Sequence, residues 1–123
     1  MDNKSCIRVF ADVNQIKECK KDISSKQSNF NNLSNVLGLA GNEVRFKIIY
    51  LLHKEGKMCP CDLSDVLEMT VPAISQHLKK LREGGVIKDK KVAQTIFYSL
   101  SNEYNEVLLP VLKLVNSKSF ENA

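Results

Sequence analysis

Two cysteines separated by one residue, Cys59 and Cys61, carry the most distinctive chemistry in this sequence. Thiolates are strong ligands for soft metal and metalloid ions, and two of them this close together can bind the same ion. A helix is expected to begin beside them, and the partial positive charge at the N-terminus of a helix favours anionic ligands. The pair therefore predicts a site for a soft ion, with redox sensing or inert thiols as the alternatives.

Two thiols rarely satisfy such an ion, so a third ligand is expected. Cys6, in the N-terminal arm, is the best candidate for it. Cys19 lies on the apolar side of a predicted helix, where a buried structural thiol is at least as good an interpretation as a metal ligand. Asp62 fits the role of a helix-capping residue better than that of a ligand.

The composition is that of one globular domain with a short extra arm: the chain has 123 residues, of which 43% are hydrophobic and 26% charged. Its longest apolar run, Ile48 to Leu52, is too short to span a bilayer, and its first residues lack the apolar stretch of a secretion signal. We therefore expect a cytoplasmic protein with reduced cysteines and no membrane partner. The formal net charge of +4 mildly favours a polyanionic partner.

Apolar residues recur at helical spacing in several stretches that turn and capping residues delimit. Asn42 and Thr70 are expected to cap two of these helices, and the polar segment from Ser24 to Asn29 is expected to be a linker. The sequence predicts, in chain order, helices at about 13–23, 30–37, 43–55, 62–68 and 71–83, strands at about 86–90 and 95–100, and a last helix from about 101 to 115.

This order of elements predicts a mainly α protein with a small β-hairpin, namely a winged helix-turn-helix with additional N- and C-terminal helices. The expected parts are an arm with a short amphipathic helix at 1–27, the winged helix-turn-helix domain at 28–118 and a tail at 119–123. An apolar stripe is expected to bury one side of the helix at 71–83 and consists of Val71, Ile74, Leu78 and Leu81.

The opposite side of that helix, together with the following hairpin, forms the predicted DNA-binding surface. Gln76 can pair with an adenine edge, Ser75 can serve a base or a phosphate, and the cations suit phosphates. Residues 71–100 contain six basic and two acidic side chains, which supports a nucleic-acid partner. His77, on the flank of the stripe, is expected to bond within the protein or to a phosphate rather than read a base. The predicted DNA-binding residues are Ala73, Ser75, Gln76, His77, Lys79, Lys80, Arg82, Lys88, Lys90 and Lys91.

The stretch from about Leu33 to Leu100 resembles the ArsR/SmtB family of metal-responsive repressors. The resemblance rests on Gly41 to Ile48, on Met58 to Leu63, on the segment from Val71 to Leu78 with its Ser-x-His-Leu core, on Leu81 to Ile87 and on Ile96 to Leu100. It implies a homodimer built from the terminal helices. It also implies binding to a double-stranded, imperfectly palindromic operator and release of that operator when an inducer binds.

Within the family, the cadmium- and lead-sensing branch completes a cysteine pair like this one with an arm cysteine, which Cys6 matches. A second arm cysteine of that branch is replaced here by Phe10, so the resemblance implies a three-thiolate site suited to Pb(II), Hg(II) or As(III) more than to tetrahedral Cd(II) or Zn(II). The third local cysteine of the arsenic sensors would fall near Ser64 and is absent. The family's C-terminal zinc ligands are also absent, since their positions hold Asn102, Tyr104, Val115 and Lys118.

These observations lead to one hypothesis: a homodimeric DNA-binding repressor, not an enzyme, that releases its operator when a Pb(II), Hg(II), As(III) or Cd(II) ion binds through Cys59, Cys61 and Cys6. No organic cofactor is expected. A thiol-redox-sensing regulator of the same fold is the first alternative, although cysteines one residue apart form a strained disulfide. A thiol enzyme and a winged helix that binds only protein are the remaining alternatives.

Overall fold

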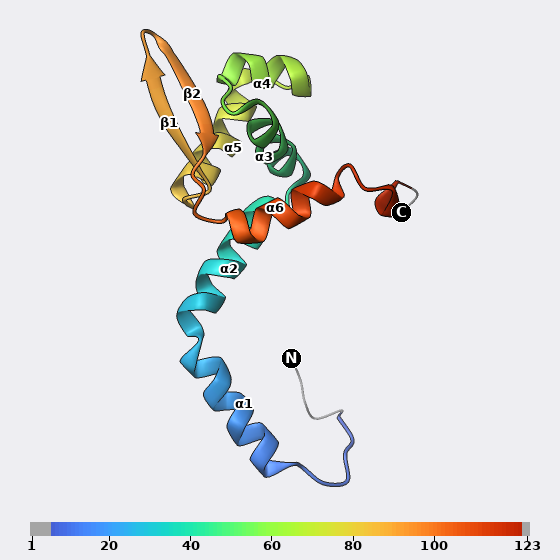
Figure 1. Ribbon diagram of the computed structural model, residues 1–123. Coiled ribbons are helices and arrows are strands. Elements are labelled where there is room, and N and C mark those ends of the chain that lie inside the picture. The colour runs from blue at the N-terminus through green and yellow to red at the C-terminus, as the bar shows by residue number, and fades with distance from the viewer. Residues whose placement is uncertain (1–5, 122–123) are drawn as a thin grey trace. The chain divides into compact units, whose positions relative to one another are not determined.

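A computed structural model describes residues 6–121, which divide into two compact units between Leu33 and Ser34 (Figure 1). The first unit contains helix α1 (Val13–Ser25) and the beginning of helix α2 (Gln27–Ala40). The second contains the end of α2 and the remaining elements in the order α3, α4, α5, β1, β2, α6 and a short 3-10 helix, Lys118–Phe120. The protein is thus mainly helical with one β-hairpin, as predicted.

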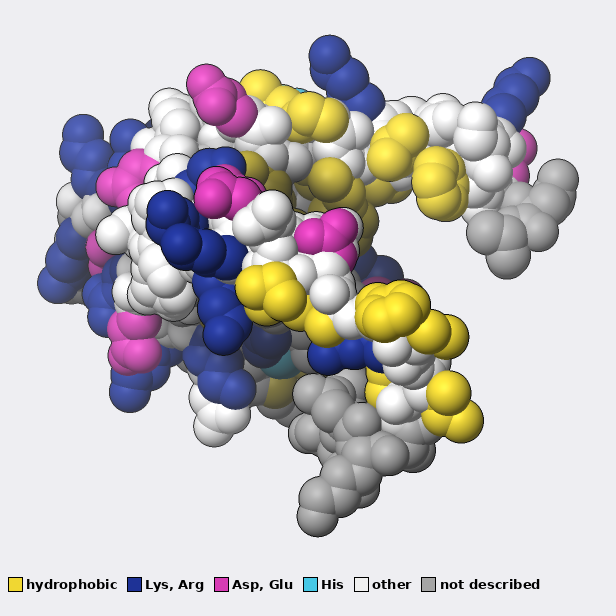
Figure 2. Space-filling model, turned by 90° about the horizontal axis from the view of Figure 1, so that it is seen from below, with side chains coloured by type: hydrophobic (Ala, Val, Ile, Leu, Met, Phe, Trp, Pro, Cys, Tyr) yellow, Lys and Arg dark blue, Asp and Glu magenta, His cyan; other side chains and the backbone are white. Residues whose placement is uncertain are grey.

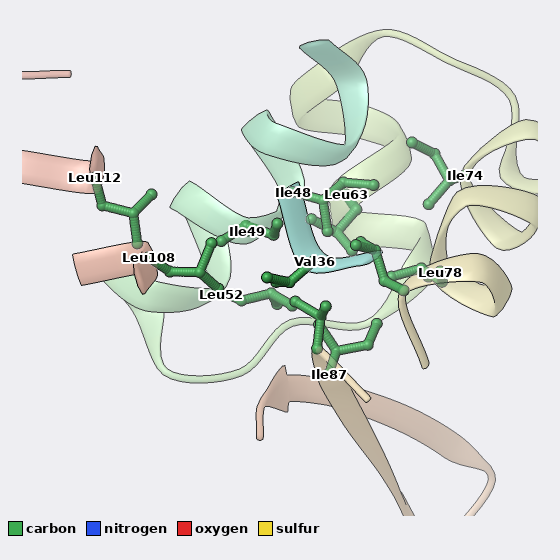
Figure 3. Packing of buried hydrophobic residues seen from close by; sticks show 12 residues of the cluster. Val36, Ile48, Ile49, Leu52, Leu63, Ile74, Leu78, Ile87, Leu108 and Leu112 are labelled. Atoms are coloured by element: carbon green, nitrogen blue, oxygen red, sulfur yellow. The ribbon is translucent and has the colours of Figure 1, made fainter. Parts of the chain in front are cut away.

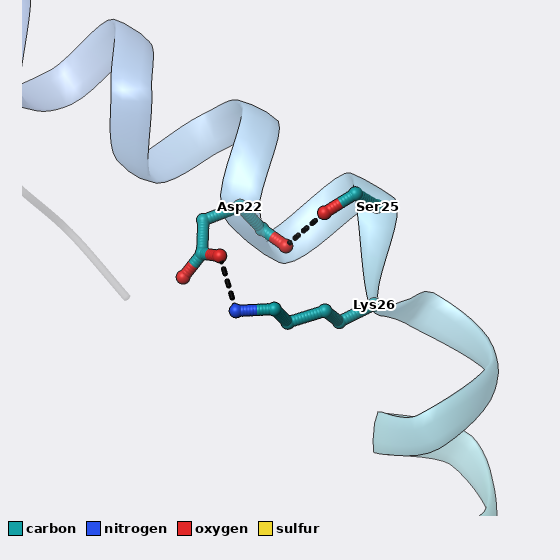
Figure 4. Close-up of polar contacts among 3 residues, drawn as sticks. All are labelled: Asp22, Ser25 and Lys26. Carbon is teal, nitrogen blue, oxygen red and sulfur yellow. Dashed lines mark hydrogen bonds and ion pairs between the residues drawn. The ribbon is translucent and has the colours of Figure 1, made fainter.

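Only one residue, Lys26, separates α1 from α2, so the predicted linker from Ser24 to Asn29 is wrong. Its polar side chains bond locally in the helical conformation (Figure 4). Asp22 forms an ion pair with Lys26, and the Ser25 hydroxyl donates to the Asp22 carbonyl oxygen at 2.9 Å. The Gln27 side-chain amide donates to that of Asn31 at 3.0 Å. These contacts one turn apart favour two helices over a flexible segment.

Helix α3 (Glu43–Glu55) begins and ends where its capping residues predicted. The side chain of Asn42 accepts a hydrogen bond from the Arg45 N–H at 3.1 Å. Gly56 ends the helix with φ of 87°, a conformation that favours glycine over residues with a β-carbon.

Helices α4 (Pro60–Leu67) and α5 (Val71–Glu83) form the helix-turn-helix. Thr70 caps α5 as predicted, accepting from the Ala73 N–H at 3.3 Å. Helix α4 starts two residues earlier than expected because Pro60 fits its first turn, where no amide donor is needed. Cys59 is therefore the N-cap residue and Asp62 lies in the first turn, so the capping role expected of Asp62 is wrong.

Strands β1 (Ile87–Val92) and β2 (Thr95–Leu100) pair antiparallel, from Ile87 opposite Leu100 to Val92 opposite Thr95. Strand β1 runs two residues further than predicted because pairing continues to the turn. Helix α6 (Asn105–Leu114) starts later than predicted. Ser101 closes the sheet instead, since its hydroxyl donates to the Gly85 carbonyl oxygen at 2.6 Å and its N–H to that of Val86 at 3.0 Å.

The core of the second unit lies between its helices and the base of the hairpin, where the labelled side chains point toward one another (Figure 3). Its buried members are Val36, Ile48, Ile49, Leu52, Leu63, Ile74, Leu78, Leu81, Val86, Ile87, Leu108 and Leu112. Val71 was expected in the α5 stripe but is 39% exposed, because the first turn of α5 extends beyond this core. Among residues 6–121, no helix combines the length and apolar character needed to cross a membrane.

Candidate nucleic-acid interface and thiol site

Helix α5 presents its polar side to solvent because Ile74, Leu78 and Leu81 hold its other side in the core. The predicted DNA-binding residues of this helix are exposed, except for Ala73 and His77, which are half-buried. Two of its cations have acidic neighbours: Lys79 lies 3.9 Å from Glu83, and Arg82 donates to Asp89 of β1 at 3.2 Å. The structure thus brings together an exposed helix surface that can enter a major groove.

His77 lies on the side of α5 that approaches Arg45 of α3. Burial lowers the pKa of His77 below its usual value of 6.5, and the positive charges of Arg45 and Lys80 lower it further. Its Nδ1 atom is buried and has no hydrogen-bond partner among residues 6–121, so Nδ1 does not make the internal bond that was expected. The sequence did not identify Arg45, whose Nε donates to the Leu39 carbonyl oxygen at 2.8 Å.

The turn between α4 and α5 is held by Ser64, which the sequence did not identify. The Ser64 hydroxyl donates to the Met69 carbonyl oxygen, and the Met69 N–H donates to the Ser64 carbonyl oxygen at 3.1 Å. Glu68, between them, has left-handed backbone angles with φ of 54°. Ser64 therefore fixes the turn that sets α5 relative to α4.

The hairpin, or wing, has two chemically different faces, because side chains alternate along a strand. The inner wing face contains Ile87, Asp89 and Lys91. Ile87 is buried, and Asp89 accepts a hydrogen bond from Arg82 of α5. The outer wing face contains Lys88 and Lys90, which lie opposite Ser99 and Phe97 of β2. The three wing lysines predicted to bind DNA are therefore not on one face.

Cys59 and Cys61 lie at the start of α4, directly after a residue that pairs with the wing. Met58 forms a bridge with Tyr98 of β2: the Met58 N–H donates to the Tyr98 carbonyl oxygen at 3.0 Å, and the reverse bond measures 2.8 Å. Cys59 follows directly as the half-buried N-cap of α4 and makes no side-chain capping bond. Cys61, in the first turn, is exposed. Both are free thiols, so a ligand bound here would contact a segment attached to both elements.

In the part of the chain that the structure describes, a complete metal site is not assembled. Within residues 6–121, no group of three or more Cys, His, Asp or Glu side chains is placed to hold an ion. Cys6 is exposed in the first unit. Cys19 is also exposed and lines a shallow surface hollow on α1 with Ile16 and Ile23, so its expected burial is not found in this chain.

Apolar side chains remain exposed in both units, and some are visible in Figure 2. In the first unit they include Val13 and Ile23 of α1 and Phe30 and Leu33 of α2. In the second unit, an apolar hollow of about 230 Å³ lies between the end of α2, the start of α3 and α6. The exposed apolar residues at this hollow and further along α6 are Leu37, Val111, Leu114 and Val115.

Comparison with known proteins agrees with this architecture. Residues 42–89, from the start of α3 into β1, match the family described as "Bacterial regulatory protein, arsR family". The cadmium resistance transcriptional regulatory protein CadC homolog of Staphylococcus aureus is 28% identical over 109 residues, which cover 89% of this chain and 88% of that protein. The arsenical resistance operon repressor of Escherichia coli is 40% identical over 63 residues, or 51% of this chain and 54% of that protein.

A solved structure, that of reduced HlyU from Vibrio cholerae, superposes with a TM-score of 0.68 and 30% sequence identity. The superposition covers 76% of this chain and 98% of HlyU. The helix-turn-helix, the wing and these matches agree. The chain therefore belongs to the arsR family of bacterial regulatory proteins, as a winged helix-turn-helix DNA-binding regulator of transcription and not an enzyme.

Proposed function

We propose that the protein is a homodimeric repressor that releases its operator when a soft metal or metalloid ion binds to Cys59 and Cys61. The observation that carries this proposal is the position of the two free thiols: they begin α4 and follow Met58, which is hydrogen-bonded to the wing. The similarity to a cadmium resistance regulator and to an arsenical resistance repressor supports an ion of this class.

On the DNA side, α5 would read base edges with Gln76 and Ser75, while its cations would bind phosphates. Lys80 is the best phosphate ligand on the helix, because it is exposed and forms none of the ion pairs found among residues 6–121. Lys91 would add a contact from the inner wing face. Ala73 is small enough to allow close approach to a base, and His77 would reach a phosphate only through its Nε2 atom.

On the ion side, two thiolates are an incomplete donor set. We assign the third thiolate to Cys6 of the partner subunit. Three sulfur ligands suit Pb(II), Hg(II) or As(III), and Cd(II) would need a further ligand.

Release of DNA would follow from the attachment of the site to both DNA-binding elements. An ion held by Cys59 and Cys61 constrains the start of α4 and, through Met58, the strand β2. If that constraint disfavours the geometry that fits an imperfect palindrome, linkage requires the ion to bind the free dimer more tightly than the DNA complex, typically by about 1–3 kcal/mol.

The dimer itself would bury the apolar hollow between α2 and α6 together with the exposed residues beside it. Water contact with this surface is unfavourable by roughly 25 cal/mol for each Å² of apolar area. A second copy of the same chain would also bring the two recognition helices to a fixed spacing.

The test is to select an operator duplex from a randomised pool with the metal-free protein, then titrate the complex with each ion while recording fluorescence anisotropy. We expect Pb(II), Hg(II) or As(III) to release the duplex near one ion per site, and Mg(II) to have no effect. A complex that withstands all four candidate ions would refute the proposal.

Thiol-redox sensing is the second candidate function, favoured by the exposed free thiol of Cys61 and by the similarity to HlyU, whose reduced form is among the solved structures. In the same titration, release by hydrogen peroxide but by none of the ions would favour this alternative.

A further inference from the structure

Helix α5 begins with an exposed valine. Val71 is the first residue of the helix, and 39% of its surface is accessible to solvent. Ile74 and Leu78, about one and two turns further along, are fully buried and point into the core (Figure 3). A single exposed apolar side chain is common on proteins, so the role of Val71 depends on where it is held and on what it can contact there.

The first turn of α5 holds Val71 in a fixed position. The Thr70 hydroxyl accepts a hydrogen bond from the Ala73 N–H at 3.3 Å, and the Thr70 carbonyl oxygen accepts one from the Ile74 N–H at 3.0 Å. Pro72 follows Val71, and its ring fixes the backbone in a helical conformation where no amide donor is needed. The valine side chain therefore projects from a capped helix start rather than from a loop.

Val71 adjoins the residues that are proposed to read bases. Residues four apart lie on the same side of a helix, so Val71 lies one turn before Ser75, and Gln76 follows directly. All three side chains are exposed. In a recognition helix, the N-terminal residues are the ones that meet base edges in the major groove. Val71 thus extends the proposed reading surface by one turn toward the start of α5.

An aliphatic side chain at this position favours one feature of the major groove. The base edges present hydrogen-bond donors and acceptors there, and their apolar group is the C5 methyl of thymine. Val71 cannot pair with a donor or an acceptor, and covering such a group would leave it without a partner, which is unfavourable. Its neighbours Pro72 and Ala73 also lack polar side-chain atoms, so the start of α5 matches a methyl group better than a polar base edge.

We propose that Val71 contacts the C5 methyl of a thymine in each half-site and thereby selects thymine at that position. The inference rests on the proposed reading of the operator by α5. A helix rises about 1.5 Å per residue, so Val71 lies roughly 7.5 Å before Gln76 along the helix axis. That distance is about two base-pair steps of roughly 3.4 Å. The thymine is therefore expected about two base pairs from the adenine that Gln76 would contact.

The experiment replaces the thymines of the selected operator by uracil, one position of each half-site at a time, which removes only the methyl group. Fluorescence anisotropy measures the Kd for each duplex. At one position the wild-type protein should bind the uracil duplex more weakly, by about fourfold for each half-site, because one methyl-sized apolar contact is lost. In Val71→Ala this penalty should disappear at the same position. Val71→Ile retains a branched apolar side chain and should retain the penalty.

Two controls separate this inference from the proposed function. Val66→Ala shortens another exposed valine, on α4, and should show the wild-type penalty. Lys80→Gln should weaken binding to the thymine and uracil duplexes by the same factor. If Lys80→Gln leaves binding unchanged, operator binding by α5 is wrong. If Lys80→Gln weakens binding as expected but Val71→Ala shows the wild-type penalty at every thymine, Val71 does not contact a thymine. The same conclusion follows if the wild-type protein binds every uracil duplex as tightly as the thymine duplex.

A second copy of the chain is the competing partner of this side chain. If Val71→Ala changed the oligomeric state in sedimentation velocity and left the uracil penalty of the wild type intact, the valine would belong to a protein interface, and the proposal would be overturned.

Discussion

Cys59 and Cys61 differ in their surroundings although only Pro60 separates them. Cys61 is exposed, whereas Cys59 is half-buried and its carbonyl oxygen accepts the Leu63 N–H at 3.1 Å. An ion would therefore reach Cys61 first. Its second bond, to Cys59, would constrain the start of α4. The sequence could predict the pair and its helix start, because both are local features.

His77 gives the protein a pH-dependent stability. Its pKa in the folded state is lowered by burial and by Arg45 and Lys80, so below about pH 6.5 the unfolded chain binds more protons than the folded protein. Above that pH, His77 does not reduce the free energy of unfolding. As the pH falls toward the lowered pKa, protonation of His77 in the unfolded chain reduces the free energy of unfolding.

We predict that His77→Asn reduces the fall in the free energy of unfolding between about pH 7 and about pH 5.5, measured by urea denaturation at each pH. His53→Asn retains His77 and should keep the wild-type fall. Equal pH dependence in His77→Asn and the wild type would show that His77 does not titrate as described.

At the scale of elements, caps and stop residues predicted the helices well because their bonds are local. Asn42 and Thr70 mark helix starts in the structure as in the sequence. The break between α1 and α2 was mistaken for a linker, because polar composition does not reveal the ion pair and hydrogen bonds that hold residues 22–31 in helices. The three wing lysines were predicted as part of one surface, although strand alternation places them on two faces. The bridge from Met58 to Tyr98 joins distant residues and left no periodic signal.

The close packing of α2 on the end of α5 was equally invisible in the sequence. Gly84, the C-cap of α5, has ordinary backbone angles, but a β-carbon there would overlap the Leu39 side chain. Glycine is needed at this position for space rather than for conformation.

We predict that Gly84→Ala lowers the free energy of unfolding by about 1–3 kcal/mol, as overpacking usually does. Gly38→Ala is the matched control, because Gly38 lies inside α2 with nothing within 4 Å of an added β-carbon. It should raise the free energy of unfolding by about 0.5–1 kcal/mol through its helix propensity. Chemical denaturation measures the free energy of unfolding of both variants. If both variants are stabilised, or both destabilised, the close packing at Gly84 is contradicted.

At the scale of the whole molecule, the second unit has an apolar hollow with exposed residues beside it, and among residues 6–121 no third side chain joins the thiol pair to hold an ion. The sequence could nominate Cys6 only through family resemblance, since neither spacing nor periodicity fixes how an arm meets a distant segment. In the proposed homodimer, a second copy of the chain would cover the hollow and supply the third thiolate.

We predict that Val111→Glu converts the proposed dimer to a monomer, because Val111 is exposed at the hollow and a carboxylate buried there by the dimer would be unpaired. Sedimentation velocity measures the change. Val66→Glu places the same charge on a more exposed valine of α4 and should leave the dimer intact. A dimeric Val111→Glu protein would place the interface elsewhere.

The most direct test of the account is ion-dependent operator release by Cys59→Ser/Cys61→Ser, measured by anisotropy beside the wild type. The variant should bind the operator with wild-type affinity, since neither thiol belongs to the proposed DNA-reading surface, and it should keep the operator at ion concentrations that release the wild-type protein. Release of the variant at the wild-type ion concentration would contradict the claim that these two thiols couple ion binding to DNA release.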